Sequence, residues 1–131
     1  MASKMFLLAV LFAFLAVTLN ASNASESCDC KSLADRQFKL SHEIAAIFLP
    51  NKGLEAACSE EERLKAGDYM FGFMNELDET KPCQGTYPEP KAFHSSCSAV
   101  NDVIANFQRL VNEYLDVLKQ ICKCGCQTPS V

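Results

Sequence analysis

Residues 93–126 read FHSSCSAVNDVIANFQRLVNEYLDVLKQICKCGC and carry the longest regular pattern in the chain. Apolar side chains recur there in alternating steps of four and three, which is the spacing of one face of an α-helix. These positions are Phe93, Cys97, Val100, Ile104, Phe107, Val111, Tyr114, Leu118 and Ile121. Val103, Leu110 and Val117 make the stripe too broad for a two-stranded coiled coil. The pattern predicts a long C-terminal helix of about 30 residues, packed between two neighbours.

Two further helices are predicted upstream, each from its start signal. Ser32 with Asp35 has the spacing of a capping box, and Ser59 with Glu62 repeats it. Helical apolar periodicity follows both signals, and no segment shows the alternation typical of strands. The two predicted helices span residues 32–49 and 59–78. The expected fold class is therefore all-α, a small disulfide-stapled bundle of three main helices with a long C-terminal helix.

The amino terminus has the pattern of a secretory signal peptide. Lys4 precedes an unbroken apolar run over residues 6–17, which is too short to span a bilayer and is followed by small residues. Cleavage is predicted after Ala24, with Ala21 as the alternative, and only the alternative retains the glycosylation acceptor Asn23. We expect residues 1–24 to be removed and residues 25–131 to form a single cysteine-rich helical domain that is secreted and extracellular.

The eight cysteines of the chain are expected to form four disulfides. They are Cys28, Cys30, Cys58, Cys83, Cys97, Cys122, Cys124 and Cys126. An even number in a short secreted chain predicts a disulfide framework, because the extracellular compartment is oxidising. The thiols of CKCGC, residues 122–126, are also ligands for zinc or copper, but only while reduced. Disulfides are therefore expected here, and neither a metal site nor a cofactor is assigned.

The disulfide pairing depends on the path of residues 79–92, which contain three prolines and a glycine. These fourteen residues, if extended, reach at most about 46 Å, whereas a helix of about 19 residues is about 28 Å long. The segment is therefore long enough to cross back over the bundle. If the segment crosses back, Cys58 pairs with Cys97, two members of CKCGC bond the amino-terminal pair, and the third bonds Cys83. If the segment does not cross back, one end of the bundle holds Cys28, Cys30, Cys83 and Cys97. The other end then holds Cys58, Cys122, Cys124 and Cys126. We favour crossing, because the other arrangement requires a bridge within CKCGC.

Cysteine pairs at both ends of a helical bundle give an architecture that resembles the saposin-like arrangement. That family typically carries six cysteines and starts with C-x-x-C, whereas this chain has eight and starts with C-x-C at residues 28–30. Cys83 also has no counterpart in the family pattern. The resemblance concerns architecture alone, and no lipid-binding residue is transferred to this sequence.

The charge of the chain disfavours two classes of partner. Its net charge is −4, and removal of Lys4 with the leader brings the mature chain to about −5. No basic cluster is present in the sequence, so neither nucleic acid nor an anionic membrane surface is an expected partner. No second apolar segment is long enough for a transmembrane anchor.

Catalytic signals are weak, and we expect no enzyme. His42-Glu43 begins like a zinc-protease motif, but Ala46 stands where the second histidine should be. His94 precedes two serines at a predicted helix start, where a capping role for one serine is expected rather than nucleophilic catalysis. With the cysteines in disulfides, no thiolate nucleophile remains.

Binding is the remaining class of function. Apolar residues crowd more than one side of the second helix, and with Tyr87 of the Pro-rich segment they are candidate contacts for a ligand or partner. The candidates are Tyr69, Met70, Phe73, Met74 and Tyr87. Gly67 and Gly72 interrupt this helix, and close helix packing is one explanation for them.

Two functions are consistent with this pattern. The first is a secreted non-catalytic binding protein that acts on an extracellular protein or receptor, as a signal, toxin or effector does. The alternative is a carrier that encloses a small hydrophobic ligand or lipid in the bundle. Because the C-terminal helix is predicted to be longer than its partners, a homodimer that covers its free seam is also expected.

Overall fold

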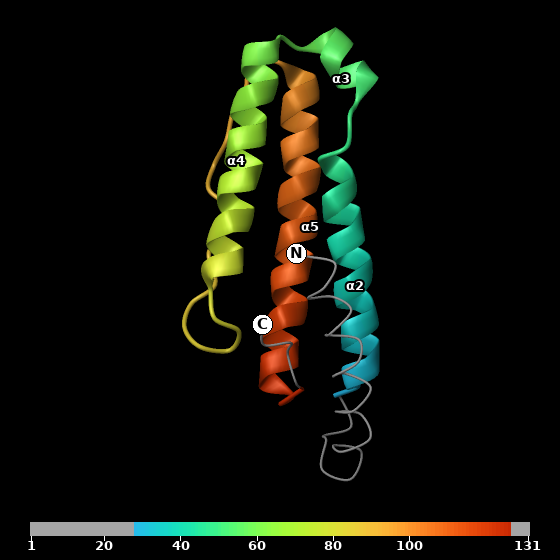
Figure 1. The fold of residues 1–131 in the computed structure, drawn as a ribbon, viewed down its shortest axis with the longest axis vertical. Coiled ribbons are helices and arrows are strands. Elements are labelled where there is room, and N and C mark those ends of the chain that lie inside the picture. The colour runs from blue at the N-terminus through green and yellow to red at the C-terminus, as the bar shows by residue number, and fades with distance from the viewer. Residues whose placement is uncertain (1–27, 127–131) are drawn as a thin grey trace.

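A computed structural model describes residues 28–126 of the chain, and Figure 1 shows their arrangement. The helices are α2 (Cys30–Ile47), α3 (Lys52–Ala57), α4 (Glu60–Glu79) and α5 (Ser98–Lys123). No strand occurs within residues 28–126, so the predicted all-α fold with three main helices and a long C-terminal helix is confirmed. The predicted signal peptide, its cleavage sites and Asn23 lie outside the described residues. No helix of the described part is long and apolar enough to cross a membrane.

Helix α5 is the centre of the bundle. Helices α2 and α4 lie along opposite sides of α5 and both pack on it, and α3 closes one end of the bundle (Figure 1). The largest fully buried side chains all come from α5, and they are Phe107, Val100, Val111 and Val117. The predicted burial of α5 between two neighbours is therefore confirmed. Its broad apolar stripe provides the surface on which both neighbours pack.

The start of α5 was predicted wrongly. The helix begins at Ser98 rather than at Phe93 and has 26 residues, so it is about 39 Å long. Ahead of it, the Ser95 N–H donates to Asn101 Oδ1 at 2.7 Å, and Asn101 Nδ2 donates back to the Ser95 carbonyl at 2.7 Å. These two bonds hold the preceding turn outside the helix. Phe93 instead lies in the linker and packs on Tyr69, with ring centroids 5.0 Å apart.

The starts of the other helices also depart in part from prediction. Ser59 caps α4 as expected and accepts the Glu62 N–H at 3.3 Å. Helix α2, however, starts earlier than predicted, because the Asp29 carboxylate rather than Ser32 is the cap and accepts the Ser32 N–H at 3.1 Å. The short helix α3 was not predicted at all. The Asn51 side chain caps it by accepting the Leu54 N–H at 3.0 Å.

The linker between α4 and α5 crosses back along the bundle, so both helices run in the same direction beside each other (Figure 1). The four disulfides join Cys28 to Cys124, Cys30 to Cys126, Cys58 to Cys97 and Cys83 to Cys122. This is the pairing that the crossing path predicts, and the alternative grouping is wrong. Both cysteines of the amino-terminal C-x-C clasp CKCGC at one end of the bundle, and Cys58–Cys97 closes the other end. All sulfur atoms of CKCGC are in bridges, which excludes the metal clasp in this state.

A buried polar pair fixes the position of α2 against α5. Gln37 Nε2 donates to the Tyr114 hydroxyl at 3.4 Å between two side chains that are both buried. Burial raises the pKa of Tyr114 to about 12, so the hydroxyl stays protonated even at a pH where an exposed tyrosine ionises. Because a buried polar group needs its partner, sliding α2 by one turn would break this bond.

The seam of α5 that motivated a homodimer is covered within one chain. Buried residues extend from Val100 near its start to Ile121 near its end. Helix α3, which was not predicted, also packs on α5. The geometric reason for expecting a second copy on this seam is therefore absent from the described fold.

Candidate functional site

The candidate contact residues predicted from sequence separate into two sets. Met70 and Phe73 are core residues with only 6% and 7% of their surface exposed, so neither reaches the surface of the bundle. Tyr69, Met74 and Tyr87 are half-buried and pack against the core. The predicted set therefore does not form one exposed surface, and the surface-exposed residues of α4 are different ones.

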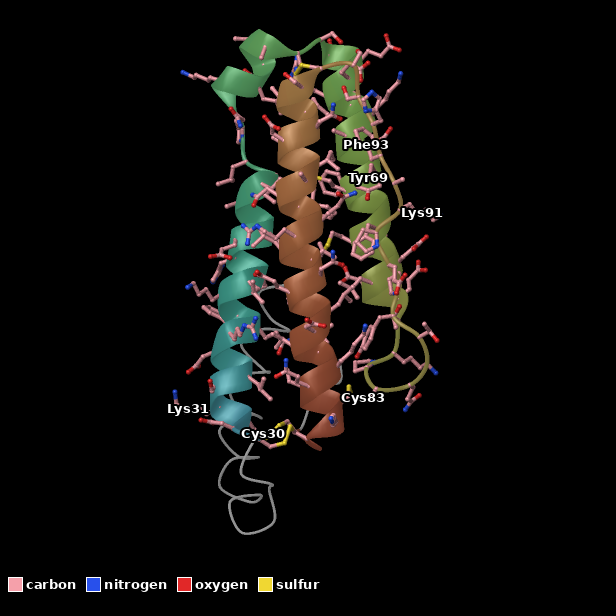
Figure 2. All side chains as sticks on the ribbon, turned by 180° about the vertical axis from the view of Figure 1, so that it is seen from behind. Cys30, Lys31, Tyr69, Cys83, Lys91 and Phe93 are labelled. Carbon is pink, nitrogen blue, oxygen red and sulfur yellow. A yellow bond between two sulfur atoms is a disulfide. The ribbon has the colours of Figure 1, made fainter. Side chains whose placement is uncertain are left out.

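Tyr69 fastens the linker to the helices. Its hydroxyl donates to the Lys91 carbonyl and accepts a hydrogen bond from Gln108 Nε2 at 3.0 Å. Gln108 also donates to the Lys91 carbonyl at 3.2 Å. Figure 2 shows Tyr69, Phe93 and Lys91 together on the side of α4 that faces the linker. Tyr69 is therefore a structural anchor whose hydroxyl is already occupied.

A different set of apolar side chains is exposed or half-exposed on α4 and in the turn that follows α2. Phe71 is 57% exposed and Leu64 is 59% exposed, although both are large apolar residues of α4. Seven residues make about two helical turns, so Leu64 lies on the same side of α4 as Phe71. The Phe71 ring packs on half-buried Phe48, the residue that caps the end of α2, at a centroid distance of 4.5 Å, and the neighbouring Leu49 is 66% exposed. We call Phe48, Leu49, Leu64 and Phe71 the apolar surface.

The exposed residues of α4 have a signal in the sequence, which is a second apolar stripe on the helix. Leu64 and Phe71 lie off the stripe formed by the buried residues of α4, which are Ala66, Met70, Phe73 and Leu77. A helix with two apolar stripes but neighbours on only one side must leave one stripe exposed. Sequence periodicity detected the excess of apolar residues on α4 but not which stripe is buried.

Gly67 and Gly72 do not serve close helix packing, contrary to the explanation considered above. Apart from its chain neighbours and the backbone of its own helix, a β-carbon added at either position meets no atom within 4 Å. Gly67 lies three residues after Leu64 and four before Phe71, so it leaves no side chain between two members of the apolar surface. Gly72 lies on a different side of α4, about 140° from Gly67.

Replacing either glycine with alanine is expected to stabilise the protein. Gly67→Ala and Gly72→Ala should each raise the free energy of unfolding by about 1 kcal/mol, because alanine favours the helix and the added methyl has free space. Urea unfolding of the two single variants measures this. A loss of stability in either variant would show that its methyl meets a neighbour and would return that glycine to a packing role.

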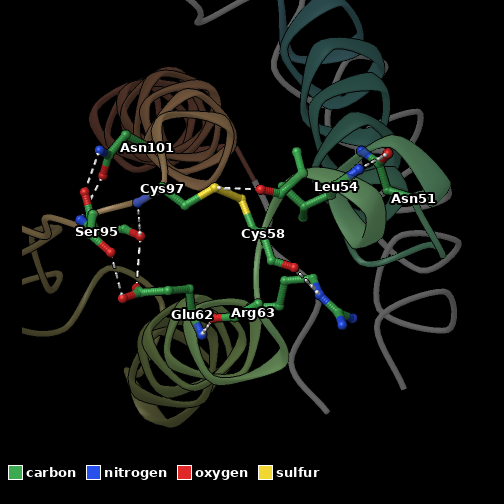
Figure 3. The surroundings of a disulfide bond; sticks show 11 residues. Asn51, Leu54, Cys58, Glu62, Arg63, Ser95, Cys97 and Asn101 are labelled. Atoms are coloured by element: carbon green, nitrogen blue, oxygen red, sulfur yellow. Dashed lines mark hydrogen bonds between the residues drawn. A yellow bond between two sulfur atoms is a disulfide. The ribbon is translucent and has the colours of Figure 1, made fainter.

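A polar cluster joins the starts of α4 and α5 beside the Cys58–Cys97 bridge (Figure 3). Glu62 of α4 accepts hydrogen bonds from the Ser95 hydroxyl at 2.7 Å and the Ser96 hydroxyl at 3.0 Å. These bonds, from Ser95 first and Ser96 second, hold the pKa of the Glu62 carboxyl below its ordinary value. Ser95 Oγ also accepts the Cys97 N–H at 3.0 Å. The cluster has the properties of a structural latch in which both serines are occupied.

The weak catalytic signals gain no geometric support in the described part of the chain. No hydrogen bond joins His94 to Ser95 or Ser96, whose hydroxyls both donate to Glu62. His42 packs edge to face on Phe38, at a centroid distance of 4.3 Å. Among residues 28–126, no group of three or more Cys, His, Asp or Glu side chains is arranged to hold a metal ion.

Two open concave regions lie on the bundle, and both have polar walls. One, of about 500 Å³, follows α2 and α5 and is lined by Arg36, Lys39, Leu40, Glu43, Ala46, Asn106, Arg109, Leu110 and Glu113. The other, of about 520 Å³, lies between the linker and α5 and is lined by Glu89, Pro90, Lys91, Ala92, Gln108, Asn112, Leu115, Asp116 and Lys119. Six of the nine residues that line each region are charged or carry an amide, which is unlike the mostly apolar lining of a site for a lipid.

No family model matches the chain, and comparison with curated proteins and with solved structures found no match.

Proposed function

We propose that this protein is a secreted, non-catalytic binding protein that contacts an extracellular protein partner through its apolar surface. The observation that carries the proposal is the exposure of Leu64 and Phe71 on the middle of α4, at 59% and 57%. A small folded protein gains stability by burying such side chains, so their exposure on a well-packed bundle favours a role in recognition.

The disulfide scaffold supports the same function. Four bridges hold both ends of the bundle, and the two exposed members Leu64 and Phe71 of the apolar surface lie on helix α4. A preordered surface loses little conformational entropy on association, so more of the contact energy contributes to affinity. The predicted signal peptide is consistent with an oxidising, extracellular setting for these bridges.

The carrier alternative receives less support from the geometry. Met70 and Phe73, which would line an interior ligand site, pack against the core, and Phe73 meets Phe107 with ring centroids 6.0 Å apart. The concave regions described above have polar walls. We therefore assign recognition to the outer surface of α4 rather than to the interior of the bundle.

The test is site-specific photo-crosslinking. A photoreactive phenylalanine analogue replaces Phe71 in the mature protein or, as control, replaces Glu76, which lies about 140° around α4. Each labelled protein is applied to intact cells and extracellular fluid of the producing organism. We expect a discrete protein adduct from position 71 alone, competed by unlabelled wild type but not by the Leu64→Ser/Phe71→Ser variant.

The two glycines supply a matched pair for the same assay. Gly67→Ala adds a methyl inside the apolar surface and should weaken competition, whereas Gly72→Ala adds the same methyl elsewhere and should compete like wild type. Equal adducts from positions 71 and 76, or full competition by the double serine variant, would overturn the proposal. A retained hydrophobic ligand in native mass spectrometry, without a protein adduct, would support the carrier instead.

A further inference from the structure

The disulfides differ in how far solvent reaches them. Of the eight half-cystines, all within the described residues, Cys83 alone is exposed, and its partner Cys122 is half-buried. Figure 2 shows Cys83 in the loop beyond the end of α4. Each of the bridges Cys30–Cys126 and Cys58–Cys97 has at least one buried half. Thiol–disulfide exchange requires a thiolate to approach a sulfur atom directly, so access favours Cys83–Cys122.

The backbone at Cys83 is held in an unfavourable conformation. Its φ is 61°, the only positive φ of a residue other than glycine in the described part of the chain. The left-handed region is unfavourable for a residue with a β-carbon. Once the bridge is opened, Cys83 is free to leave this conformation. The release of backbone strain therefore favours reduction of this bridge over the others.

The Tyr87 hydroxyl contacts both halves of the same bridge. It accepts the Cys83 N–H at 3.3 Å and lies 3.6 Å from Cys122 Sγ. A disulfide sulfur carries no hydrogen, so the hydroxyl is the donor in the second contact. A hydrogen bond to sulfur strengthens when that sulfur becomes a thiolate. Cys122 lies in the last turn of α5, where the helix dipole disfavours an anion, so a donor at this atom has a specific use.

We propose that Cys83–Cys122 is a site of selective thiol–disulfide exchange with a dithiol reductant. A thiolate of the reductant attacks Sγ of the exposed residue Cys83, the Cys83–Cys122 bond breaks, and its electron pair leaves on Cys122 as a thiolate. The Tyr87 hydroxyl donates a hydrogen bond to that thiolate. The second thiol of the reductant then displaces Cys83 from the mixed disulfide. The reductant ends as a disulfide, and its two protons pass through solvent to the two cysteines.

The selectivity leaves a defined product. Cys28–Cys124 and Cys30–Cys126 still join the chain ends, and Cys58–Cys97 still closes the other end of the bundle. Only the part of the linker around Cys83 is released, because the Tyr69 contact still holds Lys91. The exchange site stands independently of the proposed partner, since it concerns the linker and not the apolar surface.

Limited reduction followed by mapping of the free thiols tests the site. The mature protein is treated with dithiothreitol, quenched over time with acid and N-ethylmaleimide, and its labelled peptides are identified by mass spectrometry. We expect Cys83 and Cys122 to be labelled first, at least about tenfold faster than any other pair, with unchanged helical circular dichroism. Earlier labelling of any other pair, or simultaneous labelling of all eight cysteines, would overturn the proposal.

The sign of the effect of Tyr87→Phe tests the role of the hydroxyl. If the hydroxyl stabilises the leaving thiolate, its removal should slow opening of this bridge by about tenfold. If it only anchors the linker, its removal should speed opening, because the linker loosens. Tyr69→Phe is the control, since it removes another linker anchor without touching a sulfur atom, and its rate should equal or exceed that of wild type. A Tyr87→Phe rate at or above wild type, or equal slowing in both variants, would contradict this role of Tyr87.

Discussion

Deleting both bridges that join the chain ends, in the variant C28A/C30A/C124A/C126A, is expected to lower the free energy of unfolding by about 7 kcal/mol. Each bridge spans 96 positions, and the chain-entropy model assigns about 4.7 kcal/mol to the first closure of such a loop. With that loop closed, the second bridge closes only about six residues, which the same model values at about 2 kcal/mol. Because a domain of this size has a total of about 5 to 15 kcal/mol, most of the stability would be lost.

Either of the two bridges is therefore expected to supply most of the stability that the pair supplies together. Either double variant, C28A/C124A or C30A/C126A, leaves one long loop closed and should lose only about 2 kcal/mol. Urea unfolding of the three variants gives the coupling free energy between the two bridges. A quadruple variant that is already unfolded in buffer would agree with the expectation. A quadruple variant that loses no more than the sum of the two double variants would contradict it, since the bridges would then act independently.

Replacing Phe107 with alanine is expected to lower the free energy of unfolding by about 4 kcal/mol. Phe107 has no exposed surface and packs between the neighbours of α5. Its ring centroid lies 6.0 Å from that of Phe73 on α4 and 6.3 Å from that of Phe48 at the end of α2. Truncation therefore leaves a cavity in the interior of the bundle. The four disulfides restrict the movement of the helices that would close this cavity.

Phe71→Ala is the matched control for this truncation. It removes the same side chain from a position that is 57% exposed, so it should cost no more than about 1 kcal/mol. Urea denaturation with the disulfides intact measures both variants. Similar losses for Phe107→Ala and Phe71→Ala would show that Phe107 is not the central packing residue, or that Phe71 is less exposed than described.

The candidate surface was the least predictable part of the molecule. Helical periodicity marked Met70, Phe71 and Phe73 alike as apolar residues of one helix, but it does not say which neighbour covers which side. Helix α4 packs on α5 along one stripe only, and that contact buries Met70 and Phe73 while Phe71 stays exposed. Which of these residues are buried and which are exposed depends on packing partners that are distant in sequence.

The two capping boxes show the same limit at the level of single residues. Ser59 caps α4 as its local spacing predicted, but the Glu62 side chain bonds Ser95 and Ser96 rather than turning back to its own helix. At α2, Asp29 takes the capping role that spacing assigned to Ser32, and Asp35 pairs with Lys31 at 2.9 Å instead. Several hydrogen-bond or ion-pair partners compete for each of these side chains. Some of those partners come close only when the bundle has folded.

Features with short-range causes were therefore accessible from the amino-acid pattern, including the helical class, the three main helices and, through the reach of one linker, the disulfide pairing. Those causes are backbone geometry, side-chain period and chain length, which act along the chain. The start of α5, the apolar surface of α4 and the contacts of Tyr87 with Cys83 and Cys122 depended on the folded arrangement. Their cause is competition for burial and for hydrogen-bond partners, and that competition is resolved only when distant segments meet.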